Sequence, residues 1–277
     1  MIGDDFIKQY LIINIKDRNT EVLLISKSKK QYYIKQHINY KKGLKDLSEK
    51  DNNLYINEIV KIIKENIKTK LKNIYFNIQN DEIIIRNIKN IEVKKKSDMV
   101  PLIKHEINQY IPLDLQKYIV KYKKVTDSKD QKLTQAILFP KKFVHICKKI
   151  SENLKIRNKY LHINFDILQK IIDLNVINFT SEDNKNVILI ENRKEDMILN
   201  EIYENKIMES FIISKANDNN LVNNICNEST YYFGIDDDYI KNLNVRKIQI
   251  ENKLISYIDD EMKDKTLDYL CVWGMIV

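Results

Sequence analysis

The chain has 277 residues, of which 43% are hydrophobic and 31% charged, and its formal net charge is +8. This length and composition indicate a globular protein with one large domain or two modest ones, at roughly 100 to 200 residues per domain. Only four glycines are present, whereas an average chain of this length has about 19, which excludes a site built from several glycine loops. Because the lysines are spread among acidic residues, the charge predicts a solvated surface rather than a nucleic-acid partner.

Neither a secretion signal nor a membrane span is predicted. The N-terminus Met1–Asp5 is acidic where a signal peptide would be basic and then apolar. The longest apolar run, Tyr269–Val277, is shorter than the roughly 20 residues that cross a bilayer. We therefore expect a cytoplasmic protein. The three widely spaced cysteines indicate reduced thiols rather than disulfides or a zinc site: Cys147, Cys226 and Cys271.

The first ninety residues alternate between strand and helix patterns. Apolar runs predict a hairpin at 10–15 and 22–25, a third strand at 31–39, and two short strands at 74–78 and 83–88. A helix between them is predicted by apolar residues at spacings of three and four: Ile56, Val60, Ile63, Ile67 and Leu71. This succession is typical of a helix lying on a mixed sheet.

A second helix is predicted to begin near Ser97 and Asp98, which cap it. It must end by Ile111, because Pro112 forces the residue before it out of helical geometry. Pro101 is tolerated in the first turn. The predicted buried face of this helix consists of Ile103, Ile107 and Tyr110.

The rest of the chain continues the alternation. Strands are predicted at 118–125, 133–139 and 160–165, with a helix at 143–154 and another that Asp166 caps and that buries Ile167, Ile171 and Leu174. A polar stretch at 180–186 marks the main boundary. Beyond it we expect strands at 187–190, 197–203, 207–214 and 230–233, a helix after Asp236, and the apolar tail.

Two segments resemble one protein family. His105-Glu-Ile-Asn-Gln-Tyr-Ile-Pro-Leu-Asp-Leu, continuing into Tyr118-Ile-Val-Lys-Tyr, is similar to the passage from helix to strand in the type IV pilus assembly protein PilM. Tyr269-Leu-Cys-Val-Trp-Gly-Met resembles the family's closing helix. The resemblance implies an α/β, actin-like (ribonuclease H-like) fold of two lobes, 1–180 and a shortened 187–277, with a small FtsA/PilM-type insert at about 91–140.

The resemblance also implies a role as a scaffold of the type IV pilus inner-membrane platform. Proteins of this family are expected to bind the cytoplasmic N-terminal tail of the membrane protein PilN beside the insert. The partner-binding region would then be Gln109, Tyr110, Ile111 and Pro112. The protein would reach the pilus motor indirectly, would lie at the inner face of the cell membrane only through its partner, and would bind no nucleic acid.

The nucleotide loops of the family are altered in this sequence. The family's Asp-Ile-Gly-Ser-Ser-Ser phosphate loop corresponds to Asn14-Ile-Lys16-Asp17-Arg18-Asn19. Glycine lets backbone N–H groups approach phosphate and aspartate helps hold metal-bound water, so both features are lost. The adenosine loop is reduced to Gly234 before three aspartates, which suit a helix N-terminus but repel phosphate. A short linker at 215–229 replaces a long helical subdomain. We expect no cofactor and no ATPase activity.

Three other interpretations stay open at this point. Lys16 and Gly234 would carry residual ATP binding, an equivalent adaptor of a type II secretion system would share the same features, and net charge alone would support a nucleic-acid binder. A metal site is not expected. His105-Glu106 begins like a zinc-protease motif, but Gln109 stands where the second histidine is needed.

Overall fold

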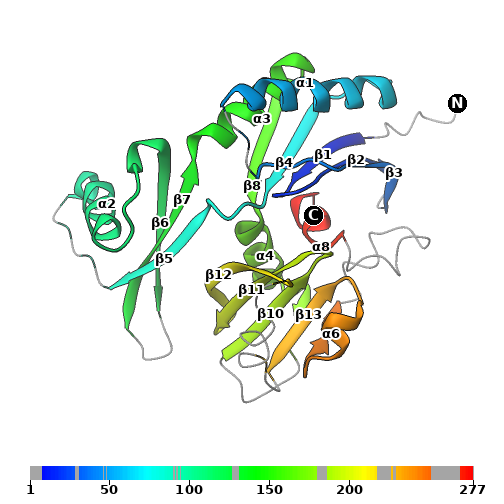
Figure 1. The fold of residues 1–277 in the computed structure, drawn as a ribbon. Helices are drawn as coiled ribbons and strands as arrows, with labels where there is room; N and C mark the ends of the chain where they lie inside the picture. Colours follow the sequence, from blue (N-terminus) through cyan, green and yellow to red (C-terminus); the bar gives the residue numbers. More distant parts are fainter. Residues whose placement is uncertain are drawn as a thin grey trace, which may run out of the picture. The chain divides into compact units, whose positions relative to one another are not determined.

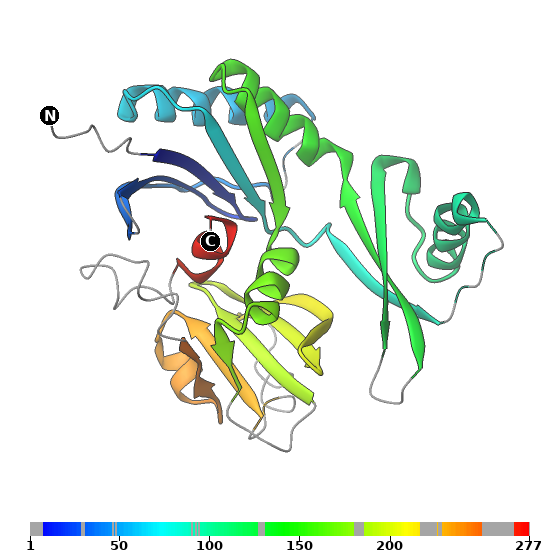
Figure 2. The same ribbon diagram turned by 180° about the vertical axis from the view of Figure 1, so that it is seen from behind.

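The computed structural model describes residues 8–28, 31–45, 47, 49–89, 91, 93, 95–126, 131–179, 186–216, 226, 229–250 and 269–276 (Figures 1 and 2). The chain divides into two compact units. Unit 1 comprises Met1–Asn80, Lys142–Leu168 and Asn252–Val277, and unit 2 comprises Asp81–Lys141 and Gln169–Glu251. The predicted lobes 1–180 and 187–277 are continuous stretches, and that division stays a prediction.

Unit 1 is built on a five-stranded mixed sheet of order β3-β2-β1-β4-β8. β1 is antiparallel to β2 and parallel to β4, with Ile12 opposite Leu23 and Leu11 opposite Ile74. The apolar run in β1 is fully buried, as expected for a central strand covered on both faces. The strands are β1 Lys8–Ile15, β2 Thr20–Ser28, β3 Gln31–Tyr40, β4 Asn73–Ile78 and β8 Asn158–Ile163.

Helices cover both faces of this sheet. Figure 1 shows α1, Glu49–Asn66, and α3, Lys141–Asn153, on one face and α8, Leu270–Ile276, on the other. The predicted stripe of α1 is buried from Ile56 to Ile63, but Leu71 lies beyond the helix, which ends at Asn66. α8 is buried from Leu270 to Met275, and its Trp273 is 0% exposed.

Unit 2 contains a second sheet with the same order and strand directions, β12-β11-β10-β13-β14. Its strands are β10 Asn186–Asn192, β11 Asp196–Tyr203, β12 Lys206–Ser214, β13 Thr230–Gly234 and β14 Arg246–Lys247. The short helix α6, Asp238–Lys241, places Ile240 against Ile190 and Leu199. β9, Ile177–Asn178, pairs with β15, Gln249–Ile250. The repeated order indicates that the fold uses the same sheet twice.

A small α/β insert completes unit 2. Three antiparallel strands in the order β5-β7-β6 carry helix α2, Met99–Tyr110, and the 3-10 turns Lys96–Asp98 and Leu115–Lys117. The strands are β5 Ile84–Lys89, β6 Tyr118–Thr126 and β7 Lys132–Pro140. Because β5 pairs with β7, the insert's sheet begins before the predicted start at 91.

Most predicted elements are found, but besides Leu71 three local details are wrong. Asp98 precedes α2 without a side-chain capping bond. Tyr110, expected in the core, is 80% exposed, whereas Ile103 and Ile107 are buried as predicted. Leu174, expected inward, is 51% exposed because it follows the last residue of α4, Asn164–Asp173. The charged segment 127–130, where a turn between the strands at 118–125 and 133–139 is predicted, and most of the predicted boundary at 180–186 lie outside the described residues.

Candidate functional sites

The turn between β1 and β2 holds the first set of predicted positions, Asn14, Lys16 and Asp17. The Lys16 amide donates to the Asn19 carbonyl at 2.9 Å, which closes a tight turn. The Lys16 ammonium lies 3.0 Å from the Glu21 carboxylate, which also accepts a 2.9 Å hydrogen bond from Asn14. Burial acts to raise the pKa of Glu21, but Lys16 and Asn14 outweigh it and lower that pKa. The charge of Lys16 is therefore neutralised within the turn.

A segment containing Gly43 covers the backbone of this turn. The amide of Leu44 donates to the Lys16 carbonyl at 3.0 Å, and the amide of Lys45 donates to the Asp17 carbonyl at 2.8 Å. A Cβ atom at Gly43 would lie 2.2 Å from the Lys16 carbonyl oxygen, so only glycine fits. The sequence analysis did not predict this role of Gly43. The available signal was that glycine is scarce in this chain, so each remaining glycine is expected to have a structural reason.

A network of buried amides lies where β1 and β4 end. Asn77 is 0% exposed and donates to the Asn14 side-chain oxygen at 3.0 Å and to that of Asn164 at 3.3 Å. The Asp17 carboxylate, 8% exposed, accepts a 2.5 Å hydrogen bond from Asn80. The carboxyl ends of the strands are where α/β sheets bind ligands. Here neutral amides occupy that position, and the carboxylate of Asp17 is hydrogen-bonded inside the chain.

Unit 2 repeats this arrangement at the turn between β10 and β11. The Ile235 amide donates to the Asn192 carbonyl at 2.9 Å, and the Asn192 side chain donates to the Ile235 carbonyl and to Asp237. Gly234 has φ +96°, and a Cβ there would lie 2.3 Å from the Asn192 carbonyl oxygen. Gly234 is therefore needed because its backbone lies very close to the backbone of Asn192.

Two of the aspartates that follow Gly234, Asp236 and Asp237, form ion pairs with lysines. Asp237 caps α6 by accepting from the Ile240 amide at 3.1 Å and pairs with Lys215 at 2.5 Å. Burial acts to raise the pKa of Asp237, but the bonds from Lys215, the Ile240 amide and Asn192 lower it. Asp236 pairs with Lys247 at 2.5 Å, and this bond lowers its pKa. The predicted helix-terminal role is confirmed for Asp237.

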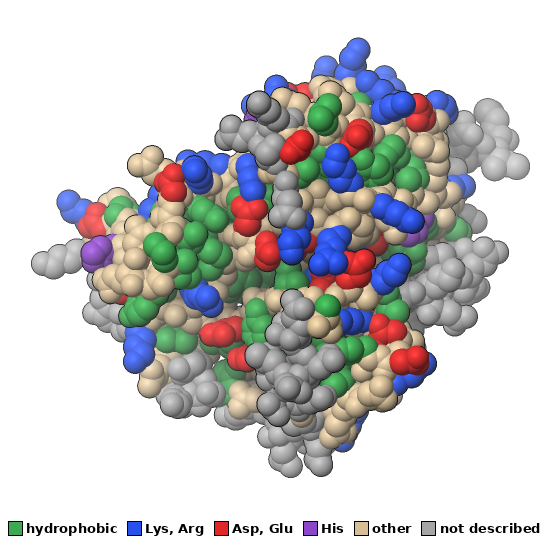
Figure 3. Space-filling model, in the orientation of Figure 1, with side chains coloured by type: hydrophobic (Ala, Val, Ile, Leu, Met, Phe, Trp, Pro, Cys, Tyr) green, Lys and Arg blue, Asp and Glu red, His purple; other side chains and the backbone are tan. Residues whose placement is uncertain are grey.

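The predicted partner-binding residues lie together at the C-terminal end of α2. Gln109, Tyr110 and Pro112 are exposed, and Ile111 is half-buried. The Ile111 amide still donates to the Ile107 carbonyl at 2.9 Å, so the turn is firmly attached to the helix. Figure 3 shows hydrophobic side chains at the surface of the insert. Tyr110 presents a large aromatic surface on an ordered element.

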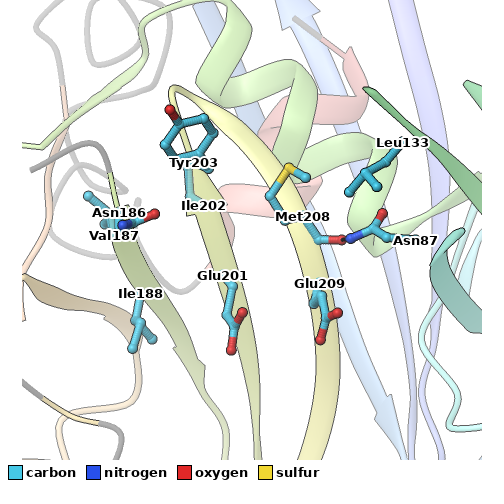
Figure 4. Close-up of a pocket in the computed structure, with 10 residues that line it drawn as sticks. All are labelled: Asn87, Leu133, Asn186, Val187, Ile188, Glu201, Ile202, Tyr203, Met208 and Glu209. Carbon is cyan, nitrogen blue, oxygen red and sulfur yellow. Dashed lines mark hydrogen bonds between the residues drawn. The ribbon is translucent and has the colours of Figure 1, made fainter. Parts of the chain in front are cut away.

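A pocket in unit 2 was not predicted at all. It has a volume of about 410 Å³ and lies between the insert and the sheet of β10, β11 and β12 (Figure 4). Two glutamates, Glu201 and Glu209, stand on neighbouring strands at its rim. No local sequence signal could reveal it, because its walls come from strands that are distant in sequence.

Comparison with known proteins gives a consistent answer about the fold. By sequence, the chain matches no family profile and no curated protein. By structure, it is similar to a PilM–PilN type IV pilus biogenesis complex, with a TM-score of 0.65, 11% identity and 96% of each chain covered. A Bacteroides thetaiotaomicron protein with an actin-like ATPase fold and unknown function aligns with a TM-score of 0.52, 10% identity, and 94% and 95% of the two chains covered. The chain has the actin-like fold.

A third similar structure comes from a secretion system. The cytoplasmic domain of EpsL, an inner-membrane component of the Vibrio cholerae type II secretion system, aligns with a TM-score of 0.54 and 7% identity over 83% and 84% of the chains. The predicted resemblance to PilM is thus confirmed for the fold.

Among the described residues, no helix is long and apolar enough to cross a membrane, and no three side chains come together as metal ligands.

Proposed function

We propose that this actin-like protein is a cytoplasmic adaptor of a type IV pilus assembly platform and binds the cytoplasmic tail of a PilN-like membrane protein. The observation that carries the proposal is the likeness to a PilM–PilN complex over 96% of both chains. That coverage includes the insert, which is the part that the resemblance associates with tail binding. Association with the membrane would then come through the partner alone.

The contact surface in this proposal is the end of α2. Tyr110 is 80% exposed, and tyrosines are enriched among the residues that contribute most to protein interfaces. Pro112 restricts the backbone two residues after Tyr110, so the tyrosine stands on a backbone of fixed conformation. Less conformational entropy is lost on binding when the backbone is already ordered.

We also propose that this protein binds no nucleotide and is not an ATPase. Support comes from the two turns, whose backbone carbonyls and side chains bond to the segments that contain Gly43 and Gly234. In each unit one glycine, Gly43 or Gly234, brings two stretches of the chain together instead of admitting phosphate. Lys16 is paired with Glu21, so the cation available for residual binding is neutralised.

Calorimetry with the tail of the PilN-like protein encoded in the same genome tests the adaptor role. Tyr110→Ala should weaken binding roughly tenfold or more, with little change in melting temperature. Tyr160→Ala removes another exposed tyrosine, on unit 1, and should leave the affinity unchanged. Absence of binding by the wild type would refute the proposal. Equal affinity of the two variants for the tail would show that Tyr110 does not belong to the interface.

Thermal unfolding with ATP and magnesium tests the loss of nucleotide binding. A ligand at 100 times its dissociation constant adds about 2.7 kcal/mol of stability, so a rise in melting temperature would restore the ATP-binding interpretation. We expect no shift.

The similarity to EpsL favours a second candidate, an adaptor of a type II secretion system. Both candidates predict binding to the tail of a membrane protein. The genes that neighbour this one distinguish them, since each system is encoded with its own membrane partner.

A further inference from the structure

The unpredicted pocket of unit 2 combines an apolar floor with an acidic rim. Its floor is made of buried side chains contributed by three different strands, and the amides of Asn87 and Asn186 complete the wall. The buried floor residues are Leu133, Tyr203 and Met208, which pack together. Glu201 and Glu209, both exposed, form the rim. All of these residues belong to unit 2.

Hydrogen bonds from the insert hold the pocket wall to the sheet. Gln135 on β7 donates to the carbonyls of Ile207 and Met208 at 3.0 and 2.8 Å, and Asn87 on β5 donates to the Met208 carbonyl at 2.9 Å. These bonds satisfy the outer edge of β12, which would otherwise present free carbonyls. The pocket is therefore a built feature with walls fixed from two sides.

The two rim carboxylates repel each other. Glu201 and Glu209 are paired directly across β11 and β12, and Figure 4 shows their side chains side by side. Like charges in directly opposite positions destabilise a sheet. Burial, and then the charge of Glu209, raise the pKa of Glu201.

Neither glutamate side chain is paired with a cation in the part of the chain that the structure describes. There, the carboxylates of Glu201 and Glu209 form no ion pair and no side-chain hydrogen bond, although the chain carries 47 lysines and arginines. Other acidic residues of unit 2 are paired, including Asp173 with Lys206 and Asp237 with Lys215. The unpaired acidic rim thus fits a cation supplied from outside the described chain.

The geometry points to an arginine side chain of a partner peptide as the occupant, with its methylene stem on the apolar floor and its guanidinium between Glu201 and Glu209. A long basic side chain has this combination of an apolar stem and a charged head. The guanidinium offers five donors in a planar fork, which suits two carboxylates from two residues. Calcium takes six to eight oxygen ligands, so two carboxylates fit a metal poorly.

The source of this arginine rests on the proposed function. Cytoplasmic segments next to membrane-spanning helices are rich in lysine and arginine, so the tail of a membrane partner would supply the cation. Tyr110 and the acidic pocket would then be two separate contacts for one tail, and they are separable by mutation.

Nuclear magnetic resonance of methyl-labelled methionine tests the pocket directly. The chain has six methionines, and Met208 on the floor is assigned with Met208→Leu. Titration with acetyl-Ala-Arg-Ala-amide at millimolar concentration should shift the Met208 methyl signal, whereas the matched glutamine peptide should not. Glu201→Gln with Glu209→Gln should weaken this binding by about tenfold, and Asp81→Asn, a change at an exposed acidic residue of unit 2, should not.

Stability measurements exclude a folding defect as the explanation. Because the glutamine variants relieve repulsion, their melting temperatures should equal or exceed that of the wild type. No Met208 shift, an equal shift with the glutamine peptide, or unchanged binding by the double variant would overturn the inference. If the arginine peptide binds through the glutamates while the PilN-like tail does not bind at all, the pocket's specificity stands and the proposed function fails. If the tail binds the double variant as tightly as the wild type, the tail is not the occupant.

Discussion

Replacing Gly43 with alanine is expected to destabilise unit 1. The added Cβ would lie 2.2 Å from the Lys16 carbonyl oxygen and 2.4 Å from the Asp17 carbonyl carbon and oxygen. These are backbone atoms, so a change of side-chain rotamer cannot relieve the clash. The segment at 43–45 must therefore move away from the turn between β1 and β2.

The size of the effect follows from the bonds that this movement breaks. The hydrogen bonds from Leu44 to Lys16 and from Lys45 to Asp17 would lengthen or be lost, at about 0.5–1.5 kcal/mol each. Overpacking in a site without free space costs about 1–3 kcal/mol. Together these give an expected loss of about 2–4 kcal/mol, since relaxation that relieves the clash is also what breaks the bonds.

The single tryptophan provides the assay. Trp273 is 0% exposed and belongs to unit 1, so its fluorescence during urea unfolding follows the unit that contains Gly43. The midpoint for Gly43→Ala should fall by on the order of 1 M urea. Lys41→Ala, at an exposed position in the same loop, should change stability by less than about 0.5 kcal/mol. A Gly43→Ala midpoint equal to that of the wild type would refute the close contact between this loop and the turn.

Two further predictions concern unit 2. Gly234→Ala should destabilise β10 and β13 by about 2–3 kcal/mol, because φ is +96° and the Cβ would meet the Asn192 carbonyl at 2.3 Å; faster amide hydrogen exchange in these strands is the readout, and unchanged exchange would contradict it. Asp237 has a lowered pKa, so its stabilising effect is complete above the unfolded-state value of about 3.9 and is lost as the pH falls through the folded-state pKa. The melting temperature of the wild type should exceed that of Asp237→Asn at pH 7, and the difference should narrow below about pH 4; a constant difference would show that the charge of Asp237 is not involved.

Local sterics and periodicity made much of the fold predictable. The hairpin of β1 and β2, the strands β6 and β7, and the end of α2 before Pro112 all follow from patterns within about ten residues of chain. Errors occurred where periodicity was extended past the end of an element. Leu71 and Leu174 continue the spacing of a helix in sequence but lie beyond the helices themselves.

The candidate sites divide in the same way. The scarcity of glycine was readable from the sequence, and Asp237 was correctly expected at a helix N-terminus. The exposure of Tyr110 was not readable, because helical spacing places it on the buried face of α2, whereas Ile107, one turn earlier, is the last residue of α2 in the insert's core.

By itself, the sequence determined the succession of strands and helices, because these depend on the conformational preferences of short segments, and it showed directly that glycine is scarce. Only the tertiary structure decided which backbones Gly43 and Gly234 bring together, and it alone placed Glu201 beside Glu209 above an apolar floor. Those features depend on strand register and on contacts between segments far apart in the chain, and a pattern of neighbouring residues does not encode either one.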